Sequence, residues 1–205
     1  MVVKEIINSM LPSIWPLIFF ISVVAITLRI TYLMKSGKKF ILYKELLSLV
    51  FIIYIICLYY IFTKNDTGGG GFNIIPFKEM FRYKFGTYKF WKNIIGNILI
   101  FVPLGYFSSY FINNKKISYN IIPALIISAS VEGMQYYIGR SFDIDDIILN
   151  VLGSFCGLLI YVALRAIKER LPKFMRSDGF INFIIILIII LSIFFSFKLD
   201  ILKYL

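Results

Sequence analysis

Six apolar stretches, each about twenty residues long, constrain the fold of this 205-residue chain more than any other feature of its sequence. A helix rises about 1.5 Å per residue and the hydrocarbon of a bilayer is roughly 30 Å thick, so such a stretch can span a membrane. The stretches are Ile14–Met34, Glu45–Thr63, Trp91–Phe111, Tyr119–Ile138, Asp146–Arg165 and Phe180–Phe197. The mean hydropathy of +0.84 also indicates an integral membrane protein.

The six stretches predict helices, because every backbone polar group must be satisfied within the segment when no water is present. We therefore expect an all-α polytopic membrane protein with about six transmembrane helices. The chain divides into an N-terminal two-span segment at 1–66, a core at 67–165, and a basic loop with a C-terminal span at 166–205.

The long connection between the second and third stretches has a structure of its own. Gly68 to Gly71 form a flexible run. Asn73 to Phe77 are expected to form a turn, because Pro76 disfavours helical backbone at the residue before it. Apolar and basic side chains then alternate around a short segment: Phe77, Met80, Phe81 and Phe85 against Lys78, Arg82 and Lys89. This pattern is typical of an interfacial or re-entrant amphipathic helix. It serves either as a basic loop on lipid headgroups or as a lid over a site.

The distribution of Lys and Arg predicts the orientation, because short cytoplasmic loops are enriched in positive residues. Eleven positive residues fall in the first, third and fifth connections, whereas four fall in the fourth connection and the two tails. The long second connection carries six more, but long loops count for little in this rule. We therefore expect both termini to be extracellular.

Unusual chemistry is concentrated between Gly139 and Gly153, where Asp143, Asp145, Asp146 and Asn150 enter an apolar stretch. Charged groups in hydrocarbon are costly unless they are paired or face a wet cavity, so these residues are functional candidates. The chain contains no histidine, which excludes histidine-based catalysis and metal ligation. Its two cysteines lie inside predicted spans and do not indicate a disulfide framework.

Three of the predicted helices each carry one stripe of polar and small residues, given a turn of about 100° per residue. The stripes are Asn93, Gly96 and Asn97; Ser128, Glu132, Gln135 and Gly139; and Asp143, Asp146, Asn150, Gly153 and Gly157. Asn97 and Glu132 each lie about six residues from the external end of their predicted helix, and Asn150 lies about seven residues beyond Asp143, which is roughly 9 to 10 Å in each case at 1.5 Å per residue. The sequence therefore predicts a polar pocket that opens to the outer face.

Structural roles explain some of the same residues. Small residues let helices pack closely in lipid, and Asn, Gln and Ser often hydrogen-bond between helices. Ser141 or Asp143 can cap the fifth helix, whose first amides favour an anionic neighbour. Asp145 lies on the opposite side of that helix, where we expect it to act as a cap or to face solvent.

Glu132 also has a structural alternative to a role in a functional site. It is one of the few acids within the predicted spans, and Arg140 and Lys92 lie near the same end of their helices. A structural ion pair between Glu132 and either cation would satisfy the buried charge.

Four motifs between about Gly71 and Tyr161 resemble, in order and spacing, those of the VanZ-like membrane proteins. The motifs are Asn73–Phe77, Asn93–Gly105, Val131–Gln135 and Gly139–Gly153. The resemblance implies a bacterial plasma-membrane protein, mostly from Gram-positive species, and the name-giving member is associated with low-level resistance to teicoplanin, a lipid-bearing glycopeptide. It also implies nine ligand-binding candidates: Asn73, Asn93, Asn97, Glu132, Gln135, Arg140, Asp143, Asp146 and Asn150.

Two functions fit these residues. In the first, the protein needs no cofactor and binds an amphiphilic envelope lipid or a lipoglycopeptide target at the outer leaflet. Phe77, Phe81 and Phe101 would accommodate the acyl chain, and binding would contribute to glycopeptide resistance by competition or masking. Its partners would be membrane lipids and a lipid-anchored envelope polymer or lipoglycopeptide. A nucleic-acid partner is not expected, because the basic residues are dispersed and no recognition motif is present.

The second function is enzymatic modification of an envelope lipid or polymer. Glu132 with Asp143 or Asp146 would form an acid/base pair, with a divalent cation such as Mg²⁺ or Ca²⁺ as the only cofactor to consider. The acids are accompanied by no nucleophile elbow, phosphate-binding loop or recognised metal-ligand spacing. We therefore predict no metal site and favour binding over catalysis.

Overall fold

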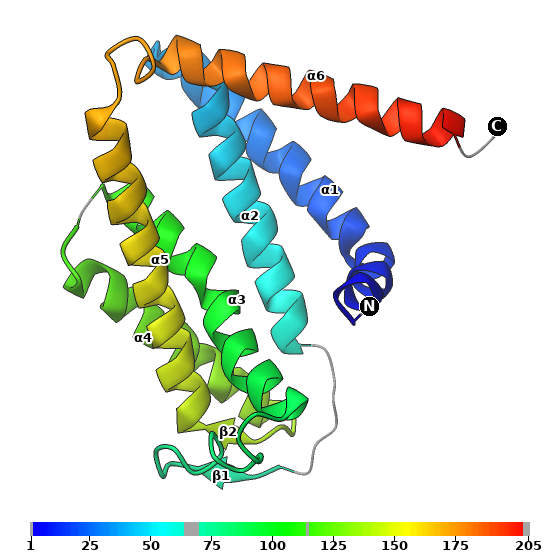
Figure 1. Cartoon of the computed structure of the whole chain (residues 1–205), viewed down its shortest axis with the longest axis vertical. Coiled ribbons are helices and arrows are strands. Elements are labelled where there is room, and N and C mark those ends of the chain that lie inside the picture. The colour runs from blue at the N-terminus through cyan, green and yellow to red at the C-terminus, as the bar shows by residue number, and fades with distance from the viewer. Residues whose placement is uncertain (1, 64–69, 114, 203–205) are drawn as a thin grey trace. The chain divides into compact units, whose positions relative to one another are not determined.

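The computed structural model describes residues 2–63, 70–113 and 115–202, with side chains described for 12–63, 70–113 and 115–192. Where they are described, the predicted apolar stretches lie in helices, except that the fourth ends one residue beyond its helix, at Ile138 (Figure 1). The helices are α1 Val2–Ser36, α2 Leu42–Thr63, α3 Tyr88–Ile112, α4 Ser118–Tyr137, α5 Ile144–Arg170 and α6 Asp178–Leu202. The all-α class predicted from the sequence is therefore confirmed.

Four helical segments within the described residues are both long enough and apolar enough to cross a membrane. They are Pro12–Ser36 of α1, together with α2, α3 and α5. The apolar part of α6 with described side chains, Asp178–Ser192, is shorter, and α4 carries several polar residues. A multi-pass membrane protein is supported, while the count of six spans stays a prediction.

The chain forms two compact units, which we describe separately. The first contains residues 1–53 and 167–205, and the second contains residues 54–166. The three sequence segments at 1–66, 67–165 and 166–205 were drawn from apolar pattern and motifs, and they stay a prediction.

Polar contacts near helix ends hold the first unit together. Arg29 of α1 donates to Glu45 of α2 through Nε at 2.7 Å. The Tyr43 hydroxyl of α2 donates to Asp178 Oδ1 at the start of α6 (2.8 Å), and its backbone amide donates to Asn182 Oδ1 (3.0 Å). These contacts join α2 to both of its neighbours in this unit.

Helices α3 and α5 of the second unit approach so closely that their contact requires glycine. A Cβ atom added at Gly153 would overlap the carbonyl oxygen of Ile98, and one added at Gly157 would overlap that of Val102. The predicted stripe of small residues on α5 is thus a packing surface, as its structural interpretation proposed.

A two-residue parallel strand pair, which the sequence did not predict, lies at the end of the second unit where α5 begins (Figure 1). Strand β1 is Phe72–Asn73 and strand β2 is Phe142–Asp143, with Asn73 opposite Asp143. The rings of Phe72 and Phe142 stack with their centroids 4.9 Å apart. The pair ties the long second connection to the start of α5.

The expected amphipathic helix in the second connection is wrong: residues 75–86 form a series of turns. Phe77 has a positive φ of 69°, which a helix does not accommodate. Gly68 and Gly69 of the glycine run lie outside the described residues, whereas the Gly71 carbonyl accepts a hydrogen bond from the Phe142 amide at 2.9 Å. Local turn hydrogen bonds, such as that from the Lys78 amide to the Ile75 carbonyl (3.4 Å), take the place of a regular helical pattern within residues 75–86.

Replacing Gly153 by Ala should destabilise the second unit, because the added Cβ meets backbone that cannot move like a side chain. We expect a loss of about 1–3 kcal/mol, as for overpacked cores, measured as a lower thermal unfolding midpoint of the detergent-purified protein. Gly133→Ala is the matched control, since a Cβ there meets nothing within 4 Å. Equal midpoints for the two variants would contradict close packing of α3 and α5.

Candidate functional site

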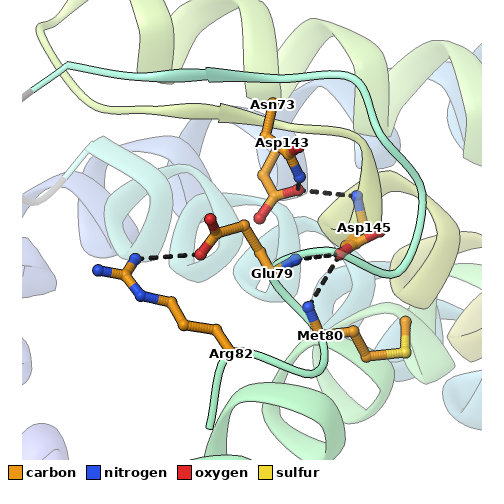
Figure 2. A network of polar contacts seen from close by, with 6 residues as sticks. All are labelled: Asn73, Glu79, Met80, Arg82, Asp143 and Asp145. Carbon is orange, nitrogen blue, oxygen red and sulfur yellow. Dashed lines mark hydrogen bonds and ion pairs between the residues drawn. The ribbon is translucent and has the colours of Figure 1, made fainter.

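The carboxylate of Asp145 holds part of the connection between α2 and α3, from Phe77 to Met80, in place (Figure 2). Asp145 is the second residue of α5 and is 1% exposed. It accepts hydrogen bonds from the backbone amides of Phe77, Glu79 (2.8 Å) and Met80 (2.9 Å). We call residues 74–86 the anchored loop. Three of its backbone amides donate to the carboxylate of Asp145, which therefore fixes the loop to the start of α5.

The expectation that Asp145 caps the helix or faces solvent is wrong. The carboxylate of Asp145 accepts hydrogen bonds from the loop amides, whereas Asp146 and Asn150 contact α3 and α4. The face that carries Asp145 is covered by the anchored loop, whose amides take the place of water. Three charge-assisted hydrogen bonds, together with the position in the first turn of α5, offset the cost of burying the carboxylate.

Asp143 lies beside this contact and caps α5. Its Oδ1 accepts a hydrogen bond from the backbone amide of Asp145 (2.9 Å) and another from Asn73 Nδ2 (2.9 Å) (Figure 2). Asn73 Oδ1 accepts from the Ile75 amide at 3.2 Å, which shapes the start of the anchored loop. Burial raises the pKa of the Asp143 carboxyl, although both hydrogen bonds act in the opposite direction. The capping role proposed for Asp143 is therefore confirmed.

Glu132 of α4 reaches the same junction from the other side. It is 1% exposed, and its Oε2 accepts the backbone amide of Asp143 at 2.9 Å. In the amide orientation that satisfies both atoms, Gln135 donates to Glu132 Oε1 (3.0 Å) and accepts from Arg140 Nη1 (3.1 Å). Among the side chains that the structure describes, Glu132 makes no ion pair with Arg140 or Lys92. Gln135 instead bridges the acid and Arg140.

The remaining members of the stripes meet in pairs along the helices. Asn97 Nδ2 of α3 donates to Asp146 Oδ1 of α5. Asn150 Nδ2 of α5 donates to Ser128 Oγ of α4 at 2.9 Å. The face and depth argument thus placed residues from three helices next to one another. Asn93 is half-buried one turn before Asn97.

Exposure divides the nine candidate residues into two groups. The buried ones are Asn73, Glu132, Gln135, Asp143 and Asn150. The half-buried ones are Asn93, Asn97, Arg140 and Asp146. Nearly all of them hydrogen-bond to one another or to nearby backbone, so a ligand has its best access to the half-buried group. The outward-facing pocket itself stays a prediction.

A second buried polar cluster was missed in the sequence. Asn120 of α4 donates to the Gly105 carbonyl (2.9 Å) and to Ser109 Oγ (3.1 Å), and it accepts from Ser154 Oγ at 3.0 Å. Ser154 is four residues after Asn150 and adjacent to Gly153, so it was detectable within the range of that stripe. Asn120 was also detectable, because it is eight residues before Ser128 and shares the buried face of α4 with it.

Aromatic and basic side chains cover the outside of the anchored loop and of the strand that leads into it. Six large apolar residues there are more than half exposed: Phe72, Ile74, Ile75, Phe77, Phe81 and Phe85. Exposed cations accompany them: Lys78, Arg82, Lys84, Lys89 and Lys92. Phe101, expected to contact an acyl chain with Phe77 and Phe81, is 0% exposed. That expectation is wrong for Phe101, because it packs in the core against Phe62.

In the described part of the chain, no group of three or more His, Cys, Asp or Glu side chains is arranged to hold a metal ion. The divalent cation of the enzymatic alternative stays a prediction. Cys57 and Cys156 are both free thiols in the structure.

Comparison with known families gives one match that covers more than half of the chain. The model of the family described as VanZ/LLP1 matches residues 51–165. This range includes α3, α4, the anchored loop and the start of α5, and therefore every residue of the site. Searches of curated proteins and of solved structures gave no match.

Replacing Asp145 by Ala should release the anchored loop, because three backbone amides lose their acceptor. The free energy that keeps the loop closed should fall by about 1–3 kcal/mol. Hydrogen exchange at the amides of Phe77, Glu79 and Met80 should then become faster. Glu79→Gln is the control: it removes only an exposed ion pair with Arg82, which contributes less than about 1 kcal/mol. Unchanged exchange in the Ala variant would refute the anchoring role.

Proposed function

The chain belongs to the VanZ/LLP1 family, and we propose that it binds an amphiphilic lipid of the bacterial cell envelope. Membership places it among membrane proteins associated with glycopeptide resistance. The ligand would be a membrane lipid, a lipid-anchored envelope polymer or the target of a teicoplanin-type lipoglycopeptide, bound at the outer leaflet of the plasma membrane.

The observation that carries this proposal is the surface of the anchored loop. It presents Phe77, Phe81 and Phe85 to the outside together with several cations, on a backbone held by the buried Asp145. Exposed aromatic rings beside Lys and Arg favour the boundary between headgroups and acyl chains, especially of anionic lipids. A fixed loop loses little conformational freedom on binding, which favours affinity.

Polar recognition would come from the half-buried members of the site. Arg140 carries a positive charge three residues after the end of α4, and Asn93 and Asn97 offer amide groups on α3. An anionic headgroup or the hydroxyl groups of a sugar are suitable partners for these donors. The buried residues, among them Glu132 and Asp143, would position the others rather than touch the ligand.

Binding is favoured over catalysis by how the carboxylates are used. Glu132 is 1% exposed, and it accepts a backbone amide, while Asp146 accepts from Asn97. A general acid or base must come within hydrogen-bonding reach of its substrate, and Glu132 is kept from that reach by its burial and by hydrogen bonds to both of its oxygens. Resistance would then follow from masking of, or competition for, the lipid surface that a lipoglycopeptide requires.

Replacing Phe81 and Phe85 together by Ser should reduce resistance without unfolding the protein, because both rings are at least two-thirds exposed. We expect the teicoplanin susceptibility of a host expressing the variant to approach that of cells lacking the protein, at equal membrane abundance. The control is Phe174→Ser, at a position that is 64% exposed in the other unit. Full resistance in the double variant would refute a binding role for the loop.

The site should be accessible from outside the cell, since positive residues predict that the connection before α5 is extracellular. Single cysteines at Ser141 and Lys115, both exposed, are introduced in a background lacking Cys57 and Cys156. A membrane-impermeant thiol reagent should label the Ser141 variant in intact cells and the Lys115 variant only after lysis. Labelling of the Lys115 variant alone in intact cells would reverse the orientation.

A further inference from the structure

An apolar groove lies between α2 and α4 within the second unit. Its volume is about 330 Å³, within the range of sites that hold small ligands. Residues from both helices line it, among them Ile55, Leu58 and Phe62 of α2, and Ile127, Val131 and Met134 of α4. Ser130 is its one residue with an aliphatic hydroxyl, which donates to the Ile126 carbonyl at 2.7 Å. The walls therefore offer almost only hydrocarbon contacts.

The surroundings of the groove indicate the chemistry of its occupant. Helix α2 is long and apolar enough to cross a membrane, so a groove on its side faces acyl chains rather than water. A peptide or a sugar would leave its polar groups unpaired there, at a high cost in free energy. A flexible hydrocarbon chain has no such groups.

The groove and the polar site share the last turns of α4, although no residue of the site lines the groove. Val131 and Met134 on its wall are the direct neighbours in sequence of Glu132 and Gln135. Gln135 holds Arg140, three residues after the end of α4, and the cations of the anchored loop belong to the same unit. An apolar groove on the same helix that positions Arg140 through Gln135 is complementary to an anionic lipid, with its chain in the groove and its headgroup near Arg140.

We infer that the groove between α2 and α4 holds one acyl chain of an anionic lipid whose headgroup is bound near Arg140. This inference rests on the proposed function and names its ligand class: a lipid with a negatively charged headgroup. The chain follows the groove from Met134 and Phe62, near the site, toward Ile127 and Ile55. Other occupants, such as a helix of a second copy of this chain, are outcomes of the test below.

The test uses the full chain in vesicles of phosphatidylcholine with a trace of phosphatidylglycerol that carries a photoreactive diazirine in one acyl chain. We expect crosslinked peptides from both walls of the groove. In Ile127→Trp, which fills the groove, this crosslinking should fall by about tenfold, the loss expected when a few buried methylene groups are displaced. Ile126→Trp is the matched control, because Ile126 is 61% exposed and absent from the groove lining.

A second comparison tests the headgroup. A phosphatidylcholine probe with the same diazirine chain should label the groove several-fold less than the phosphatidylglycerol probe, and Arg140→Gln should remove this difference. Crosslinks spread evenly over the lipid-facing helices, or equal yields in the two Trp variants, would overturn the inference. Crosslinks between two protein chains across the groove would assign it to a dimer and would also overturn it.

The outcome is separable from that of the proposed function. Loss of resistance in the Phe81 and Phe85 variant with no groove labelling would leave loop binding intact and remove the acyl-chain site. Groove labelling with unchanged resistance in that variant would keep the lipid site and remove the proposed role of the loop.

Discussion

The buried carboxylate of Asp145 is the contact on which the site depends. It joins the first turn of α5 to three backbone amides of a segment more than sixty residues earlier in the chain. A charge this well buried is stable only when hydrogen bonds replace its hydration. Because a helix terminus and a loop satisfy each other, the loop keeps one backbone shape and its aromatic residues stay exposed.

A layered polar network extends from this contact into the helices. Asp143 connects Asn73 to the start of α5, and its amide connects to Glu132 of α4. Deeper in the unit, glycines bring the backbones of α3 and α5 together, and Asn120 joins them to α4. Close packing and satisfied polar groups support each other, because short separations between helices allow direct side-chain contacts.

This arrangement separates the residues that build the site from the residues that are able to touch a ligand. Glu132, Asp143 and Asp145 are nearly inaccessible and hold a frame. The anchored loop and Arg140 form its accessible side, and the apolar groove is lined by α2 and by α4, the helix that carries Glu132 and Gln135. A rigid amphipathic surface next to a hydrocarbon groove is suited to holding a lipid without changing it chemically.

Much of this protein was determined by its sequence alone. The length of the apolar stretches predicted all six helices, and four motifs indicated the family. The helical repeat predicted the polar stripes that contain the pairs Asn97–Asp146 and Ser128–Asn150. These properties depend only on neighbouring residues or on the repeat angle of a helix. Only the tertiary structure decided the role of Asp145, the turns of the anchored loop, the burial of Phe101 and the strand pair. Each of these depends on a partner far away in the chain, and local pattern contains no information about such a partner.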